Sequence, residues 1–117
     1  MRTQRTHLID LKLPNFKGEI ATMKQHEMEK YSTEAVVLLK AMANERRFQI
    51  LCLLGDKELS VGELCQLLDL SQSALSQHLA WLRRVEIVST RKEAQNVFYT
   101  LDNEKARGVI HLLGGAK

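Results

Sequence analysis

Cysteine, proline and aromatic residues are scarce in this chain, and each scarcity excludes a class of protein. Its 117 residues include two cysteines and one proline, and 5% of them are aromatic. Two cysteines are too few for a small domain held together by disulfide bonds. No apolar run approaches the roughly 20 residues of a membrane-spanning helix, and no secretion signal precedes the patterned segments. We therefore expect a cytoplasmic protein with one core of modest size.

The charge balance permits a nucleic-acid partner without requiring one. Lys and Arg number 17 against 14 Asp and Glu, a net charge of +3. Residues 71–95 carry four basic and two acidic side chains, whereas residues 56–69 carry one basic and four acidic side chains. Positive charge is therefore concentrated in one segment of the chain.

The first half of the chain predicts an arm followed by two helices. Pro14 and Gly18 interrupt any helix in residues 1–26, which we expect to form a flexible arm or extension. An internal Met23 leaves open whether residues 1–22 belong to the native protein. Apolar residues three or four apart predict a helix over 28–43. Asn44 and Gly55 are suitable caps for a second helix over 45–54, whose expected buried stripe is Phe48, Leu51, Cys52 and Gly55.

The second half predicts a helix-turn-helix and a hairpin. Ser60-Val-Gly-Glu63 is a capping-box sequence, which predicts a helix ending near Leu68. A tight connection follows, and Ser71 is the expected N-cap of the next helix, which gives a helix-turn-helix over 60–84. Residues 87–91 and 97–101 are rich in β-branched and aromatic residues and predict the two strands of a hairpin. Asp102 is the expected N-cap of a last helix, which Gly114-Gly115 ends.

This order of elements is typical of a winged helix-turn-helix. We expect a mainly α fold with five helices and two antiparallel strands, the strands forming the wing. Residues 27–113 are assigned to one DNA-binding and dimerisation domain, residues 1–26 to the arm and residues 114–117 to a tail. The surplus apolar surface of the first and last helices predicts a homodimer.

The segment from Ser71 to Arg84 has the pattern of a DNA-recognition helix. At about 100° per residue, three leucines fall on one side and small polar residues fall opposite them. Ser and Gln side chains can hydrogen-bond with base edges and phosphates. We predict that Ser76 and Gln77 read base edges, that Ser73 and Arg84 anchor the helix, and that the wing contacts phosphate or the minor groove. The predicted DNA-binding residues are Ser71, Gln72, Ser73, Ser76, Gln77, His78, Arg83, Arg84, Arg91, Lys92 and Gln95.

Over about residues 27–113 the chain resembles the ArsR/SmtB family of bacterial repressors. The resemblance is carried by residues 35–52, 58–64, 70–84, 90–95 and 97–101, including the run Leu70-Ser-Gln-Ser-Ala-Leu-Ser-Gln-His-Leu-Ala-Trp-Leu-Arg-Arg84. Within the family it is most similar to HlyU-type virulence regulators, which activate haemolysin and toxin genes. The resemblance implies a dimer, formed through the first and last helices, that binds an imperfect inverted repeat in double-stranded promoter DNA. It also implies that the protein activates genes by displacing a nucleoid silencing protein. The protein is therefore expected to be located on the nucleoid.

The metal sites of the family do not carry over. The arsenic-type site needs three cysteines, where this chain has Ser60, Gly62 and Cys65, and one sulfur ligand is too few for a soft metal. The zinc-type site needs an Asp and a His two residues apart, but Glu104 follows Asp102. We therefore expect no metal and no cofactor.

One branch of the family senses persulfides or oxidants through a disulfide between the second and last helices. Cys52 matches the first position, but Leu113 is followed by Gly-Gly-Ala-Lys and no thiol. Cys65 can replace the missing partner only if the two Cα atoms lie within about 7 Å. Cys52 and Cys65 are therefore possible redox residues, and a thiol-responsive repressor is an alternative function. We expect the Cys52 thiol to be mostly buried and of low reactivity.

The turn after the recognition helix departs from the family pattern. Family members usually have Asp-Gly where this chain has Val85-Glu86. Without the glycine, we expect a wing that is less stable by about 1 kcal/mol.

Two other classes of function stay open. A winged helix can serve as a protein-interaction scaffold that does not bind DNA. An enzyme is not expected, because the four histidines lie on different elements without an adjacent nucleophile. We expect His78 to be half-buried, to contact phosphate or to sense pH. We expect Trp81 to anchor the recognition helix against the wing.

Overall fold

A computed structural model describes residues 10–14 and 20–114 of the chain, which forms two compact units, residues 1–37 and 38–117. The first unit contains β1 (Asp10–Pro14) and β2 (Ile20–Lys24), paired antiparallel, and most of α1 (Gln25–Met42). Sequence reasoning predicted neither of these strands within the expected arm. A search for helical periodicity does not detect strands of this length. The expected arm and tail also include residues 1–9, 15–19 and 115–117, which lie outside the described residues.

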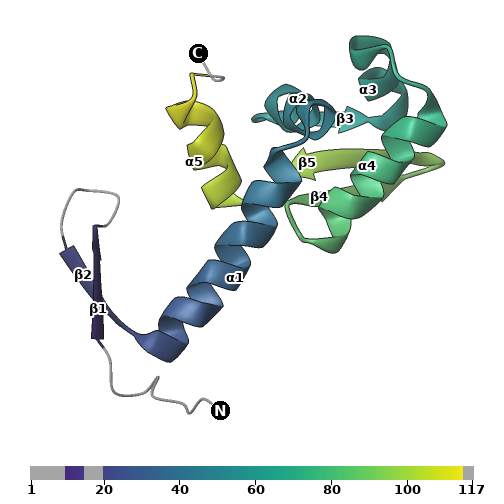
Figure 1. Ribbon diagram of the computed structural model, residues 1–117. Helices are drawn as coiled ribbons and strands as arrows, with labels where there is room; N and C mark the ends of the chain where they lie inside the picture. The colour runs from purple at the N-terminus through teal and green to yellow at the C-terminus, as the bar shows by residue number, and fades with distance from the viewer. Residues whose placement is uncertain (1–9, 15–19, 115–117) are drawn as a thin grey trace. The chain divides into compact units, whose positions relative to one another are not determined.

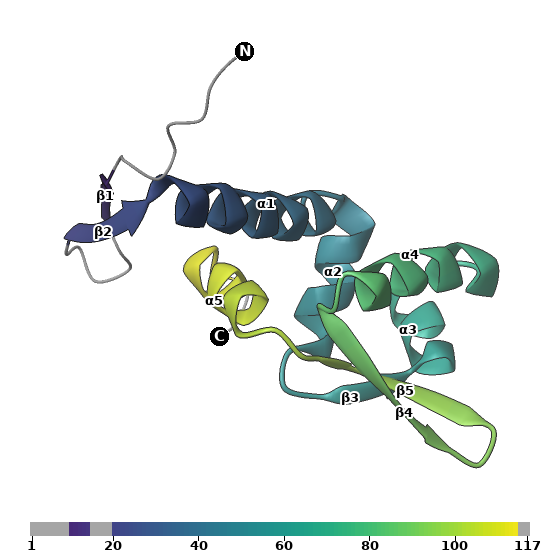
Figure 2. The same ribbon diagram turned by 90° about the horizontal axis from the view of Figure 1, so that it is seen from below.

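The second unit is a winged helix-turn-helix, as the order of elements predicted. After the end of α1 it contains α2 (Glu45–Leu54), β3 (Glu58–Ser60), α3 (Val61–Leu68), α4 (Gln72–Arg84), β4 (Val88–Glu93), β5 (Asn96–Leu101) and α5 (Glu104–Leu112). The sheet is antiparallel with the order β3-β5-β4. Figure 1 shows the β4–β5 hairpin, which is the wing, with β3 beside β5, and Figure 2 shows the tip of the hairpin extending beyond the helices.

The sheet of the wing has three strands, and the prediction of two was wrong. The additional strand is β3, in which Glu58, Leu59 and Ser60 pair with Thr100, Tyr99 and Phe98. Ser60 is also the N-cap of α3, and an N-cap residue has an extended backbone. The residues that lead into the cap are therefore extended as well, and three residues are too few to show a strand pattern.

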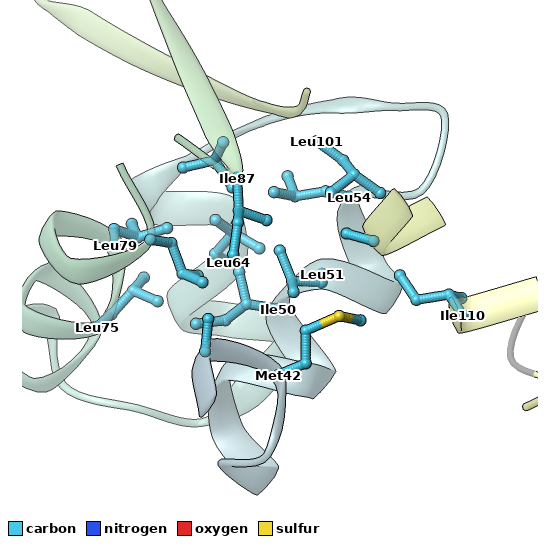
Figure 3. Packing of buried hydrophobic residues seen from close by; sticks show 14 of the residues in the cluster. Met42, Ile50, Leu51, Leu54, Leu64, Leu75, Leu79, Ile87, Leu101 and Ile110 are labelled. Carbon is cyan, nitrogen blue, oxygen red and sulfur yellow. The ribbon is translucent and has the colours of Figure 1, made fainter. Parts of the chain in front are cut away.

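The hydrophobic core joins the end of α1 to every later element (Figure 3). In α2 the wholly buried residues are Ile50, Leu51 and Leu54, whereas Phe48 and Cys52, which the sequence placed in the buried stripe, are half-buried. The buried side chains are Ala41, Met42, Ile50, Leu51, Leu54, Leu64, Leu68, Leu75, Leu79, Leu82, Ile87, Val88, Leu101, Ala106 and Ile110.

The last helix begins one residue later than predicted. Asn103 is its N-cap, and the Asn103 Oδ1 atom accepts a hydrogen bond from the Ala106 amide at 2.9 Å. Asp102 was the expected cap, but its amide donates to the Ile87 carbonyl at 2.8 Å, which continues the sheet by one residue. The helix ends at Leu112, just before the expected Gly114.

The end of α4 is a Schellman motif that requires a left-handed residue. The Ile87 amide donates to the Leu82 carbonyl, and the Glu86 amide donates to the Arg83 carbonyl, both at 3.0 Å. Between these bonds Glu86 has a φ of 64°. Glycine adopts this conformation without steric cost, whereas a side chain with a Cβ does not.

Glu86→Gly is therefore expected to raise the free energy of unfolding by about 0.5–1 kcal/mol, because it removes the steric cost of the left-handed backbone. Ala80→Gly is the matched control. Ala80 is exposed in the middle of α4, where glycine is expected to lower the free energy of unfolding by about 1 kcal/mol. Urea unfolding followed by circular dichroism measures both variants. A loss of stability in Glu86→Gly similar to that in the control would contradict the strained turn.

Candidate nucleic-acid interface

The orientation of α4 is fixed by three leucines on one of its faces. Leu75, Leu79 and Leu82 have no exposed surface. In Figure 3, Leu75 and Leu79 point from α4 toward Leu64 of α3. Burial of each leucine contributes about 1.5–3 kcal/mol, so rotation of the helix about its axis is strongly opposed. The start of the helix is fixed as well, because the Ser71 Oγ atom accepts a hydrogen bond from the Ala74 amide at 3.1 Å.

The opposite face of α4 is exposed and carries side chains suited to a DNA groove. Ser73, Gln77 and Arg84 lie on it, and Ala80 between them leaves room for a close approach. His78 is the exception among the predicted recognition residues, because it is half-buried at the edge of this face. Gln72, Ser76 and Arg83 are also exposed, but at about 100° per residue they lie at the flank of this face, nearer the leucines.

The preceding helix, α3, is held by caps at both ends. The Ser60 Oγ atom accepts from the Glu63 amide at 3.2 Å, and a Glu63 carboxylate oxygen accepts from the Ser60 amide at 2.8 Å, which is the predicted capping box. At the other end, Arg46 of α2 donates to the Leu68 carbonyl at 3.2 Å. The turn between α3 and α4 includes Asp69 in a left-handed conformation, with φ 55°. These contacts fix the geometry of the helix-turn-helix.

Trp81 contacts α2 through Arg47, and sequence reasoning did not predict this contact. The Arg47 guanidinium lies over the Trp81 ring, 4.6 Å from its centroid. The same guanidinium donates to the carbonyls of Ala41 at 2.8 Å and Lys40 at 3.1 Å, in the last turn of α1. Arg47 thus binds the end of one helix and the side of another. The sequence offered one signal that we did not use, since a cation in the first turn of a helix opposes the helix dipole and suggests another role.

His78 lies in a positive environment. Burial lowers the pKa of its imidazole, and the charges of Arg47 and Arg46 lower it further. The ring is therefore neutral at pH 7, which favours the half-buried role over that of a cationic phosphate contact.

The basic residues of the wing differ in their surroundings. Lys92 and Gln95 are exposed, and Gln95 lies in the turn between β4 and β5. Arg91 lies on β4, three residues before the turn, where it binds two carboxylates and an aromatic ring. Its guanidinium donates to Glu58 at 2.8 and 2.9 Å and to Glu93 at 2.9 Å, and lies 4.8 Å from the centroid of Phe98. These hydrogen bonds raise the pKa of Arg91 and lower that of Glu58.

Both cysteines are free and half-buried, so Cys52 is less buried than expected. Burial raises the pKa of the Cys52 thiol. Arg46 and Arg47, which precede it in α2, donate to backbone carbonyls. Cys52 therefore lacks the lowered pKa that makes a thiol reactive. In the described part of the chain, no three His, Cys, Asp or Glu side chains are grouped as a metal site requires. None of the described helices is both long and apolar enough to span a membrane.

Comparison with known proteins agrees with this geometry. Residues 44–90 match the arsR family of bacterial regulatory proteins. Over 101 residues the chain is 66% identical to the transcriptional activator HlyU of Vibrio cholerae, covering 86% of this chain and 92% of that protein. The solved structure of HlyU from Vibrio cholerae N16961 superposes with a TM-score of 0.71 at 71% identity, covering 74% of this chain and 94% of that one.

A more distant structure has the same fold. It is the homodimeric winged helix-turn-helix DNA-binding domain of a possible ArsR-family regulator from Mycobacterium bovis. It superposes with a TM-score of 0.68 at 25% identity, covering 74% of this chain and 81% of that one. The family consists of transcriptional regulators, which confirms the expectation that the chain is not an enzyme. The chain belongs to the ArsR family and is a DNA-binding transcriptional regulator.

Proposed function

We propose that the protein is an HlyU-like regulator that binds an imperfect inverted repeat in promoter DNA as a homodimer. The observation that carries the proposal is the exposed polar face of α4, opposite three wholly buried leucines. Ser76 and Gln77 read base edges in the major groove, while Ser73 and Arg84 hold the helix on the backbone. Ser71, Gln72, Arg83 and the wing residues Lys92 and Gln95 complete the surface. A face with these residue types suits direct readout better than a simple solvated surface, which normally carries Lys and Glu.

The homodimer is supported by apolar side chains that one chain leaves uncovered. They occur on α1 and at the end of α5, and large exposed apolar patches commonly mark interaction sites between proteins. The exposed residues are Tyr31, Val36, Val37 and Leu39 on α1, and Leu112 and Leu113 at the end of α5. A symmetric dimer places two copies of α4 about 34 Å apart, one turn of DNA.

Similarity to a transcriptional activator favours activation over repression. We propose that the protein activates by displacing a nucleoid silencing protein from the promoter, on the nucleoid. A footprinting experiment tests this step with promoter DNA first coated by the silencing protein. Addition of the regulator is expected to replace the extended protection of the silencer with a short symmetric footprint. Unchanged silencer protection at saturating regulator would contradict the displacement mechanism.

Two alternatives make different predictions. A protein-interaction scaffold would show no salt-dependent affinity for DNA, whereas phosphate contacts make affinity fall steeply with salt. Binding of promoter fragments at two salt concentrations separates the two. A thiol-responsive repressor would lose DNA binding on oxidation, and titration with and without reductant tests it.

Gln77→Ala is expected to relax specificity at one base pair of each half-site by about 1–3 kcal/mol, because it removes a hydrogen-bonding group from the reading face. Competition binding with single-base variants of the operator measures this effect. Glu104→Ala, on an exposed residue of α5 outside the reading face, is the control and is expected to keep the wild-type preference. An unchanged operator preference in Gln77→Ala would show that Gln77 does not read a base pair.

Sedimentation velocity is expected to show a dimer at micromolar concentration, because the apolar faces of α1 and α5 need a partner. Leu39→Glu places a charge on that apolar face and is expected to shift the protein toward monomer. Its secondary structure should be unchanged, because Leu39 is 56% exposed. A monomeric wild-type protein would remove the basis for binding an inverted repeat.

DNA affinity is expected to be nearly the same with and without reductant, because burial raises the pKa of the Cys52 thiol. The measurement is a gel shift after mild peroxide or persulfide treatment, combined with peptide mapping of the thiols. Cys52→Ser and Cys65→Ser serve as controls for each thiol. A disulfide between Cys52 and Cys65 that abolishes binding would establish the thiol-responsive alternative.

A further inference from the structure

The two basic residues of the wing lie on opposite faces of the sheet. Side chains alternate between faces along a strand. Val88 of β4 and its partner Leu101 of β5 are buried in the core. Lys92 lies four residues after Val88, so it is on the face that turns toward the helices. Arg91 is on the outer face, with its cross-strand partner Phe98.

On that outer face, Arg91 joins two strands that are not neighbours in the sheet. Its Nε and Nη2 atoms donate to the two carboxylate oxygens of Glu58 on β3, at 2.9 and 2.8 Å. Strand β5 lies between β3 and β4, and the guanidinium crosses it over the ring of Phe98. Paired hydrogen bonds of this kind fix orientation as well as distance. A third hydrogen bond, to Glu93, occupies the remaining side of the guanidinium.

Lys92 has none of these partners. Its side chain is exposed, and it makes no ion pair within the described part of the chain. Of the two cations on the wing, Lys92 is therefore the one with a free charge to offer a phosphate.

We propose that Arg91 is a positioning residue, which, through Glu58, holds the β4–β5 hairpin in the orientation that brings Lys92 to a DNA phosphate. Glu58 belongs to β3, whose last residue, Ser60, caps α3. The hydrogen bonds between Arg91 and Glu58 therefore connect the wing to the first helix of the helix-turn-helix. This proposal rests on the proposed DNA binding and revises the sequence-based assignment of Arg91 as a direct contact.

The test compares two variants that each remove one carboxylate from Arg91. Glu58→Gln breaks the link between strands, whereas Glu93→Gln removes a partner on the same strand and leaves that link intact. Loss of a negative charge by itself strengthens DNA binding. We expect Glu58→Gln nevertheless to weaken operator binding about tenfold and to lower the salt slope by about one per protomer, as Lys92→Gln does. Glu93→Gln is expected to bind within about twofold of wild type.

A double variant shows whether Glu58 acts through Lys92. If it does, Glu58→Gln/Lys92→Gln binds no more weakly than Lys92→Gln alone, because the contact is already lost. Additive losses would instead indicate a general structural effect and overturn the proposal. Arg91→Lys keeps the charge but loses the paired geometry, and it is expected to match Glu58→Gln.

Three results contradict the positioning role in different ways. Tighter binding and a steeper salt slope in Glu58→Gln would mean that Arg91, once released, binds phosphate itself. Wild-type affinity in Arg91→Lys would show that the paired hydrogen bonds to Glu58 are not needed for DNA binding. Absence of salt-dependent DNA binding in the wild-type protein would overturn the proposed function, and this inference with it. Thermal unfolding of each variant confirms that the comparison is made on folded protein.

Discussion

Burial of the leucine face of α4 is the constraint on which the rest of the structure depends. Leu75, Leu79 and Leu82 are wholly enclosed by the core, which leaves only one face of the helix for a partner. Replacement of one such leucine by alanine costs about 2–5 kcal/mol, a large part of the stability of a domain of this size. Packing therefore determines which side chains face outward, and the outward set is polar, short and basic at one end. The same contacts that stabilise the fold define its reading surface.

Two consecutive arginines, Arg46 and Arg47, fix the positions of the neighbouring helices. Arg46 binds the carbonyl at the end of α3, and Arg47 binds carbonyls at the end of α1 while stacking on Trp81 of α4. Each supplies a cation where the helix dipole is negative. Because both arise from the first turn of α2, this helix holds the end of α1, α3 and α4 together. The wing is tied to these helices from the other side, through Glu58 and Arg91.

Interactions between residues close together in sequence made much of this fold predictable. Contacts between residues distant in sequence could not be predicted. The caps Asn44, Ser60 and Ser71 act within three residues, so their helices were predicted almost to the residue. The link between Glu58 and Arg91 spans 33 positions and has no local signature. The same is true of the cation–π contact between Arg47 and Trp81, which are 34 positions apart. Most of the reading face follows from helical periodicity, whereas the role of each wing cation depends on strand register.

Mapping of backbone amide shifts on titration with operator DNA tests whether the face of α4 opposite the leucines reads DNA. We expect the largest changes on residues 71–77, at the start of α4, and on the wing near Lys92 and Gln95. Core amides of α2 should change little, since they lie behind the leucine face. Changes confined to α1 and α5, with α4 unaffected, would show that the helix presented by the leucine packing does not read DNA.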